Sequence, residues 1–196
     1  LFRSTYDTLV GGAGNDTYVV DDANVVITET AGNGTDTVQT SVLTYTLTAA
    51  NVENLTYTGV GNFTGTGSAT ANTLTGNIGS DTLYGGAGND TLFGGAGNDK
   101  FDVSLAVATG AVEATAIYAK ITDLAAGDTI AFASAGAAFS ATKTALDNTV
   151  TNLDLALAAA SNNTTIGQIT WFQYGGNTYI VENVDGTAGI AAADVV

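Results

Sequence analysis

Residues 76–102 read GNIGSDTLY, GGAGNDTLF and GGAGNDKFD, three consecutive copies of a nine-residue unit. Each copy keeps glycine, one Asp and one apolar residue at fixed positions, so a carboxylate-bearing glycine turn alternates with a strand of about three residues. A single unit of this size cannot bury its apolar side chain and must stack on its neighbours. The stretch therefore predicts an all-β coil of stacked turns and short strands.

The nine-residue frame extends toward the N-terminus. Further copies that keep the carboxylate occupy residues 2–10 with Asp7, 11–19 with Asp16, and 31–39 with Asp36. The spacing of twenty residues between Asp16 and Asp36 departs from an ideal stack. These three residues are predicted metal ligands, and Asp7 is the weakest of them because its turn lacks the glycines.

The frame is worn between residues 40 and 72. It places Leu47 at the apolar position, and residues 52–58 resemble a strand and turn without carboxylates. The expected Asp positions hold other residues, namely Tyr45, Asn54, Phe63 and Asn72. We expect strands in this segment, with weak or absent metal binding.

Oxygen ligands dominate the repeat, which indicates a hard cation. If two units make one turn of the coil, residues eighteen apart stack, so Asp81 lies next to Asp99 and Asn72 next to Asp90. Glycine-rich turns can direct backbone carbonyls inward, and the Asp adds charge to the same concavity. The predicted ligands of the central repeats are Asp81, Asp90, Asp99 and Asn72, with carbonyls of Gly85, Gly86, Gly88, Gly94, Gly95 and Gly97. Such sites favour calcium over magnesium, which prefers compact octahedral sites and retains its waters.

Calcium and folding are expected to be coupled in this repeat. Without metal, stacked carboxylates repel one another and the glycines resist ordering, so the repeat is expected to be largely disordered. Extracellular calcium modules commonly work at about 10⁻⁴ to 10⁻³ M, so the chain is expected to fold after export from a low-calcium cytosol.

Composition restricts the possible functions. The 196 residues include 19 acidic and only 4 basic side chains, for a net charge of −15, with no Cys, His, Met or Pro. This charge disfavours nucleic acid and anionic membranes as partners. The lack of His and Cys removes zinc-protease, Ser-His-Asp and thiol chemistry, so we expect no enzyme activity. No apolar run is long enough for a membrane span, and we interpret the chain, which does not begin with Met, as a piece of a longer protein.

The chain changes character after Asp102, which predicts two domains, residues 1–102 and 103–196. Residues 121–133 indicate strand, turn and strand, and residues 141–160 carry apolar residues at the spacing of a short amphipathic helix. Residues 168–183 indicate a β-hairpin around a glycine turn. We expect this region to cap the coil.

The repeat resembles the RTX (hemolysin-type calcium-binding repeat) proteins. The resemblance implies a parallel β-roll with calcium at alternating edges, and export by a type I secretion system. It also implies further calcium ligands after the repeats, for which Asp123 and Asp128 are candidates. Asp102, at the end of the last repeat, is another candidate ligand, and turn capping is the alternative for all three. The segment WFQYGGNTYIVENVDG (171–186) resembles the C-terminal region of S-layer proteins exported by this route.

The sequence therefore predicts an extracellular calcium-binding structural protein, the C-terminal β-roll part of a type I-secreted surface or S-layer protein. Its expected partners are calcium ions, the secretion machinery, and either further copies in a lattice or filament or a cell-surface polysaccharide. The alternative is a calcium-dependent folding and secretion module of a secreted RTX hydrolase or adhesin.

Overall fold

A computed structural model describes residues 7–32, 34–49, 51–103 and 119–131 with their side chains. It describes the backbone alone at residues 138–139, 168–174 and 177–182. The strands are β1 Thr8–Val10, β2 Thr17–Val20, β3 Val26–Thr28, β4 Thr37–Thr40, β5 Thr44–Thr46, β6 Asn54–Tyr57, β7 Thr64–Thr66, β8 Thr73–Asn77, β9 Thr82–Tyr84, β10 Asp90–Gly95, β11 Lys100–Asp102, β12 Ala119–Ile121, β13 Thr129–Ala131, β14 Ala138–Phe139, β15 Gln168–Tyr174 and β16 Asn177–Glu182.

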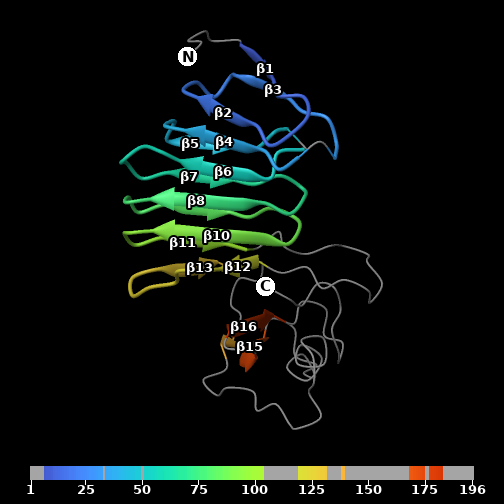
Figure 1. Ribbon diagram of the computed structural model, residues 1–196. Coiled ribbons are helices and arrows are strands. Elements are labelled where there is room, and N and C mark those ends of the chain that lie inside the picture. Colours follow the sequence, from blue (N-terminus) through green and yellow to red (C-terminus); the bar gives the residue numbers. More distant parts are fainter. Residues whose placement is uncertain are drawn as a thin grey trace.

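The strands from β2 to β13, except β3, form a parallel β-roll, as the repeat predicts. The chain alternates between a six-stranded sheet, in the order β12-β10-β8-β6-β4-β2, and a five-stranded sheet, in the order β13-β11-β9-β7-β5. All neighbouring strands in both sheets are parallel, so the roll is a stack of turns (Figure 1). We call one turn of the coil a rung. Strands β1 and β3 form a separate parallel pair.

The interior of the roll is a pair of apolar columns, one from each sheet. In the six-stranded sheet, the register stacks Tyr18, Val38, Leu55, Leu74 and Leu92, all buried. In the five-stranded sheet it stacks Tyr45, Gly65, Leu83, Phe101 and Ile130. The predicted inward ladder of Leu74, Leu83, Leu92 and Phe101 is confirmed, since all four are fully buried.

The middle of the roll is closed by aromatic packing. Gly65 leaves a gap in its column, and the ring of Phe63 fills it, because a Cβ at Gly65 would lie 2.5 Å from that ring. The Phe63 ring also stacks on Tyr57, with ring centroids 4.5 Å apart and planes at 3°. At this rung, the buried rings of Phe63 and Tyr57 therefore fill the turn where other rungs have polar side chains.

The parallel sheets continue beyond residue 102, because β12 pairs with β10 and β13 pairs with β11. The sequence predicts strand, turn and strand at residues 121–133. In the described part of this range a turn joins β12 to β13, but these two strands lie in different sheets. Further along the chain, β15 and β16 pair antiparallel, which confirms the predicted hairpin. The helix predicted at residues 141–160 lies outside the described residues.

Candidate calcium sites

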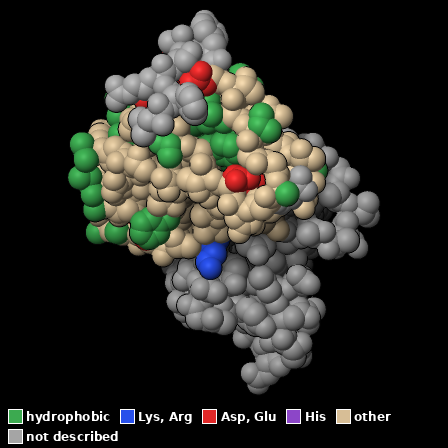
Figure 2. Space-filling view, turned by 45° about the horizontal axis from the view of Figure 1, so that its top comes forward, with side chains coloured by type: hydrophobic (Ala, Val, Ile, Leu, Met, Phe, Trp, Pro, Cys, Tyr) green, Lys and Arg blue, Asp and Glu red, His purple; other side chains and the backbone are tan. Residues whose placement is uncertain are grey.

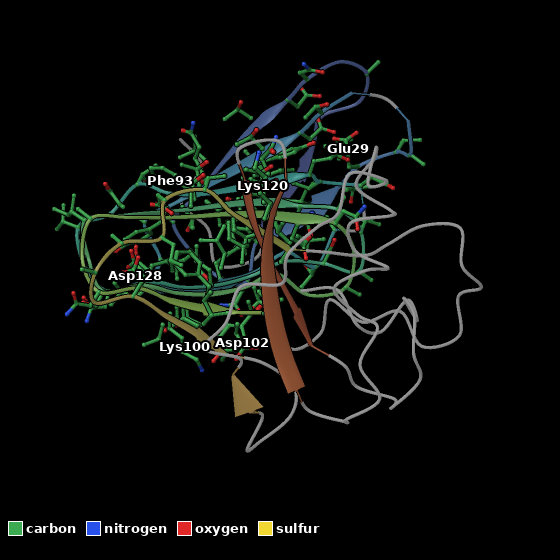
Figure 3. All side chains as sticks on the ribbon, turned by 90° about the horizontal axis from the view of Figure 1, so that it is seen from below. Glu29, Phe93, Lys100, Asp102, Lys120 and Asp128 are labelled. Atoms are coloured by element: carbon green, nitrogen blue, oxygen red, sulfur yellow. The ribbon has the colours of Figure 1, made fainter. Side chains whose placement is uncertain are left out.

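The turns between the two sheets form two edges of the roll. We call the turns that enter the six-stranded sheet the first edge, and those that enter the five-stranded sheet the second edge. Viewed from below, Glu29 and Asp128 lie at opposite edges, the first and the second respectively (Figure 3). Phe93 and the pair Lys100 and Asp102 project from opposite faces in the same view.

The first edge carries an uninterrupted polar column. Its members occupy equivalent positions in successive rungs: Asp16, Asp36, Glu53, Asn72 and Asp90. The second edge carries a column that is apolar in its first part and acidic afterwards: Leu43, Phe63, Asp81, Asp99 and Asp128. The two edges of the roll therefore differ in where they can hold cations.

The acidic side chains join each rung to the one before it. One carboxylate oxygen accepts a hydrogen bond from the backbone N–H at the equivalent position of the preceding rung, at 2.7–2.9 Å. The pairs are Asp16 N to Asp36, Asp36 N to Glu53, Phe63 N to Asp81, Asn72 N to Asp90, Asp81 N to Asp99, and Asp99 N to Asp128. The predicted stacking of Asp81 with Asp99 and of Asn72 with Asp90 is thus observed, and Asp16 and Asp36 stack despite their spacing of twenty.

Two carboxylate oxygens have the environment of cation ligands. Among the described residues, Asp16 Oδ2 and Asp90 Oδ2 are buried side-chain oxygens without a hydrogen-bond partner. A buried charged oxygen without a partner is costly, and a bound cation removes that cost. A hard divalent ion such as calcium could therefore bind at Asp16 and at Asp90. It would be held by their carboxylate oxygens and by carbonyl oxygens of the turns that carry them.

Burial affects the protonation of these groups in the metal-free protein. Desolvation raises the pKa of the Asp90 carboxyl to about 7, although the hydrogen bond from Asn72 N–H opposes the change. Burial, opposed by the Asp81 N–H bond, also raises the pKa of Asp99, and the charges of Asp128, Asp81 and Asp123 add to it. A bound calcium ion would favour the ionised forms of both groups.

The glycines of the repeat have two separate roles. Gly86, Gly88, Gly95 and Gly97 have φ values of +94°, +115°, +101° and +139°, which L side chains adopt only with strain. Gly85 and Gly94 instead leave room for the carboxylate of the same turn, because a Cβ at Gly85 would lie 2.7 Å from Asp90 Oδ2, and Gly94 faces Asp99 in the same way. The first glycine therefore admits the Asp side chain, and the later two shape the turn.

Other predicted ligands are placed differently. The register sets Asp7 level with Val25, so no carboxylate stacks on it there. Asp102 lies on the outer face of β11, where it pairs with Lys100 at 3.4 Å. Asn72 has its polar atoms satisfied without an ion, since Oδ1 accepts from Ser68 N and Nδ2 donates to the carbonyls of Val52 and Glu53.

The two carboxylates after the repeats cap the last complete turn. Asp123 accepts hydrogen bonds from Gly94 N at 3.1 Å and Gly95 N at 2.7 Å. Asp128 stacks on Asp99 and also accepts from Ala125 N at 2.7 Å. Asp128 thus extends the second-edge column, whereas Asp123 binds the backbone of the turn, as in the turn-capping alternative.

The worn segment is shifted from the predicted frame. At the Asp position of one rung the structure places Glu53 instead of the predicted Asn54. At the Asp position of another rung it places Leu43 instead of the predicted Tyr45. Tyr45, not Leu47, occupies the inward strand position, although Leu47 is buried as well. The sequence prediction does not include Glu53 among the site residues. Glu53 can be recognised because it lies two residues before an inward apolar residue, as Asp16, Asp36 and Asp90 do.

The fold and the sites together define a calcium-binding parallel β-roll. A comparison with protein-family models matches the RTX calcium-binding nonapeptide repeat, in four copies, at residues 6–25 and 66–101. The chain therefore carries RTX-type repeats, and these repeats are calcium-binding. No curated protein matches the chain.

Proposed function

We propose that this chain is part of an extracellular structural protein, exported by a type I system, in which calcium drives folding after export. The polar columns of the two edges carry this proposal, because their carboxylates join successive rungs and two of their buried oxygens lack a partner. Calcium at the turns would neutralise these columns and so couple ion binding to the stacking of rungs.

We further propose that the folded chain is a surface or S-layer component that self-assembles or attaches to the cell surface, and that it has no catalytic role. In support, the second edge exposes apolar side chains on stacked turns. Val60 is 76% exposed and Ile78 59%, and Leu43 and Leu124 are also exposed. Figure 2 shows hydrophobic side chains gathered along one edge of the roll. Exposed apolar groups of this kind often mark interaction sites.

Several further facts fit a folded extracellular module. The described residues contain no helix with the length and hydropathy of a membrane span. The net charge of −15 would keep the chains apart until calcium neutralises part of that charge. Extracellular calcium at about 10⁻³ M lies in the range where modules of this type bind the ion.

The proposal is tested by titrating the purified chain with calcium while recording circular dichroism and light scattering together, with magnesium as the control ion. We expect β-structure to form first, followed by growth of large ordered assemblies. Folding without assembly would contradict the surface-layer role and favour the alternative, a folding and secretion module of a larger hydrolase or adhesin. No calcium-dependent folding would contradict the whole proposal.

A matched pair of variants tests the assembly surface. Replacing Val60 and Ile78 with Thr removes exposed apolar area from the second edge, whereas Val19→Thr makes the same kind of change at an exposed position on the outer face of β2. We expect the first variant to fold with calcium but scatter less light, and the second to behave as the wild type. Equal scattering by all three proteins would contradict a role for this edge.

A further inference from the structure

Glu29 lies outside the matched repeats and stands where the repeat has a glycine. The pairing of Val10 with Thr28 sets Glu29 level with Gly11, the first glycine of its turn. Other turns use that glycine to admit the Asp side chain, as Gly85 does for Asp90. At this rung, Glu29 therefore places a second acidic side chain in the turn, at a position where other turns have a glycine and so no side chain.

Glu29 meets two repeat carboxylates at the first edge. One oxygen from each of Asp16, Glu29 and Asp36 lies within 4.8 Å of the others. Asp36 is 1% exposed, and its Oδ1 accepts a hydrogen bond from Asp16 N at 2.8 Å. The remaining oxygen of Asp16, Oδ2, is buried and has no hydrogen-bond partner in the described part of the chain. Three carboxylates thus converge around an oxygen that lacks a hydrogen-bond donor.

The surrounding contacts hold Glu29 in this place. Its backbone carbonyl accepts a hydrogen bond from Asn51 Nδ2 at 3.1 Å, and its Oε1 accepts from Thr30 N at 3.0 Å. The hydroxyl of the buried residue Tyr18 donates to Oε2. One phenol cannot neutralise three carboxylates, so the arrangement calls for a cation.

We propose that Glu29 is a calcium ligand from outside the repeat, which makes the Asp16–Asp36 rung a three-carboxylate site. Calcium affinity rises with the number of charged ligands and with the rigidity of the site. This site therefore binds calcium more tightly than the sites at Asp81, Asp90 and Asp99, whose turns carry glycine at the equivalent position. It fills first as calcium rises and orders the first rungs. The inference rests on calcium binding by the repeats and is independent of assembly.

Tyr18 provides a built-in reporter for the test. Terbium(III) prefers the same oxygen ligands as calcium, and a nearby tyrosine sensitises its luminescence. Because Tyr18→Phe also removes a hydrogen bond to Glu29, the two proteins are compared at saturating terbium, where the extra emission of the wild type reports ions bound at this site. We expect the first equivalent of terbium to give the Tyr18-dependent emission, and calcium to compete for it. Emission that depends on Tyr18 only after the other sites have filled would overturn the proposal, and this measurement needs no change at Glu29.

Variants then identify the ligand. Glu29→Gln keeps an acceptor for Tyr18 but removes one charge, so we expect the tightest class of sites to weaken about tenfold or more. Asp22→Asn removes the same charge from a nearby turn, where the Asp22 side chain accepts hydrogen bonds from Asn24, and should leave that class unchanged. Calcium isothermal titration, with circular dichroism at saturating calcium to confirm folding, compares them. Equal affinities in Glu29→Gln and the wild type would overturn the assignment.

Discussion

Replacing Asp90 with Asn should change the stability of the roll in opposite directions with and without calcium. Asp90 is 1% exposed, and its Oδ2 has no hydrogen-bond partner among the described residues. Its pKa is raised to about 7 by burial, so above pH 7 the folded chain carries the cost of an ionised buried group. Since one pKa unit corresponds to about 1.4 kcal/mol, this cost is at most about 4 kcal/mol. Solvent screening at the edge of the roll reduces it to about 2 kcal/mol.

Asn72 shows how an amide is accommodated at this position. Its Nδ2 donates to the carbonyls of Val52 and Glu53 in the preceding rung. An Asn at position 90 can donate in the same way to the carbonyls one rung earlier. At pH 8 in chelator, we therefore expect Asp90→Asn to be about 2 kcal/mol more stable than the wild type.

Calcium should reverse the order of stability. At a free calcium concentration a thousand times the Kd, an ion adds about 4 kcal/mol to the stability of the folded state. The variant loses most of this contribution, so it should be about 2 kcal/mol less stable than the wild type. Osmolyte-induced folding in chelator and urea unfolding in calcium measure the two free energies, with Asp22→Asn as the control for surface charge. A variant that is less stable in both conditions, or unchanged in both, would refute the reasoning.

Other predictions concern pH, packing and the turns. In chelator, stability should fall as the pH rises from 5 to 8, because the pKa of Asp90 is raised to about 7 and the unfolded chain loses this proton at lower pH than the folded chain. The raised pKa of Asp99 acts in the same direction. A pH titration of the folded fraction would contradict this if stability rose instead. Leu92→Ala removes a fully buried side chain and should cost about 3 kcal/mol in urea unfolding with saturating calcium, and a loss below 1 kcal/mol would argue against the stacked core. Gly12→Ala should cost about 1 kcal/mol, since its φ is +96° but nothing lies within 4 Å of the new Cβ. Gly88→Ala should cost at least twice as much in the same assay, because its Cβ would lie 2.7 Å from the backbone of the preceding rung; equal costs would show that the rungs are not this close.

The regular part of the roll could be predicted because its period is constant. From Phe63 to Asp99, equivalent residues are eighteen apart, so counting nine-residue units places each carboxylate and each inward apolar residue correctly. The apolar ladder and the stacked Asp pairs follow directly from that count.

The worn segment could not be placed by counting, because its rungs differ in length. The rung from Asp16 to Asp36 has twenty residues, and the next, from Asp36 to Glu53, has seventeen. A fixed frame accumulates these differences and assigns the Asp position to Asn54. The inward apolar residue of each strand, here Leu55, is the better reference. The acidic residue of a rung lies two residues before that inward residue.

Contacts between residues far apart in the sequence could not be predicted from the repeat pattern. Glu29 stands at a glycine position, so the repeat gives no reason to assign it to a site. Asp123 reaches Gly94 and Gly95 across a separation of nearly thirty residues, and only the pairing of β12 with β10 brings them together. Asp102 lies within strand β11, not in a turn. Its side chain points away from the interior, and it therefore lies on the outer face of the sheet.

Amide hydrogen exchange with and without calcium tests the central claim most directly. The backbone N–H groups of Phe63, Asn72, Asp81 and Asp99 each bond to a carboxylate of the next rung. If calcium holds those carboxylates ionised and ordered, these amides should be protected in calcium and exchange rapidly in chelator or in magnesium. Equal protection of these amides in calcium and in chelator would show that the roll is stable without the ion and would contradict the account.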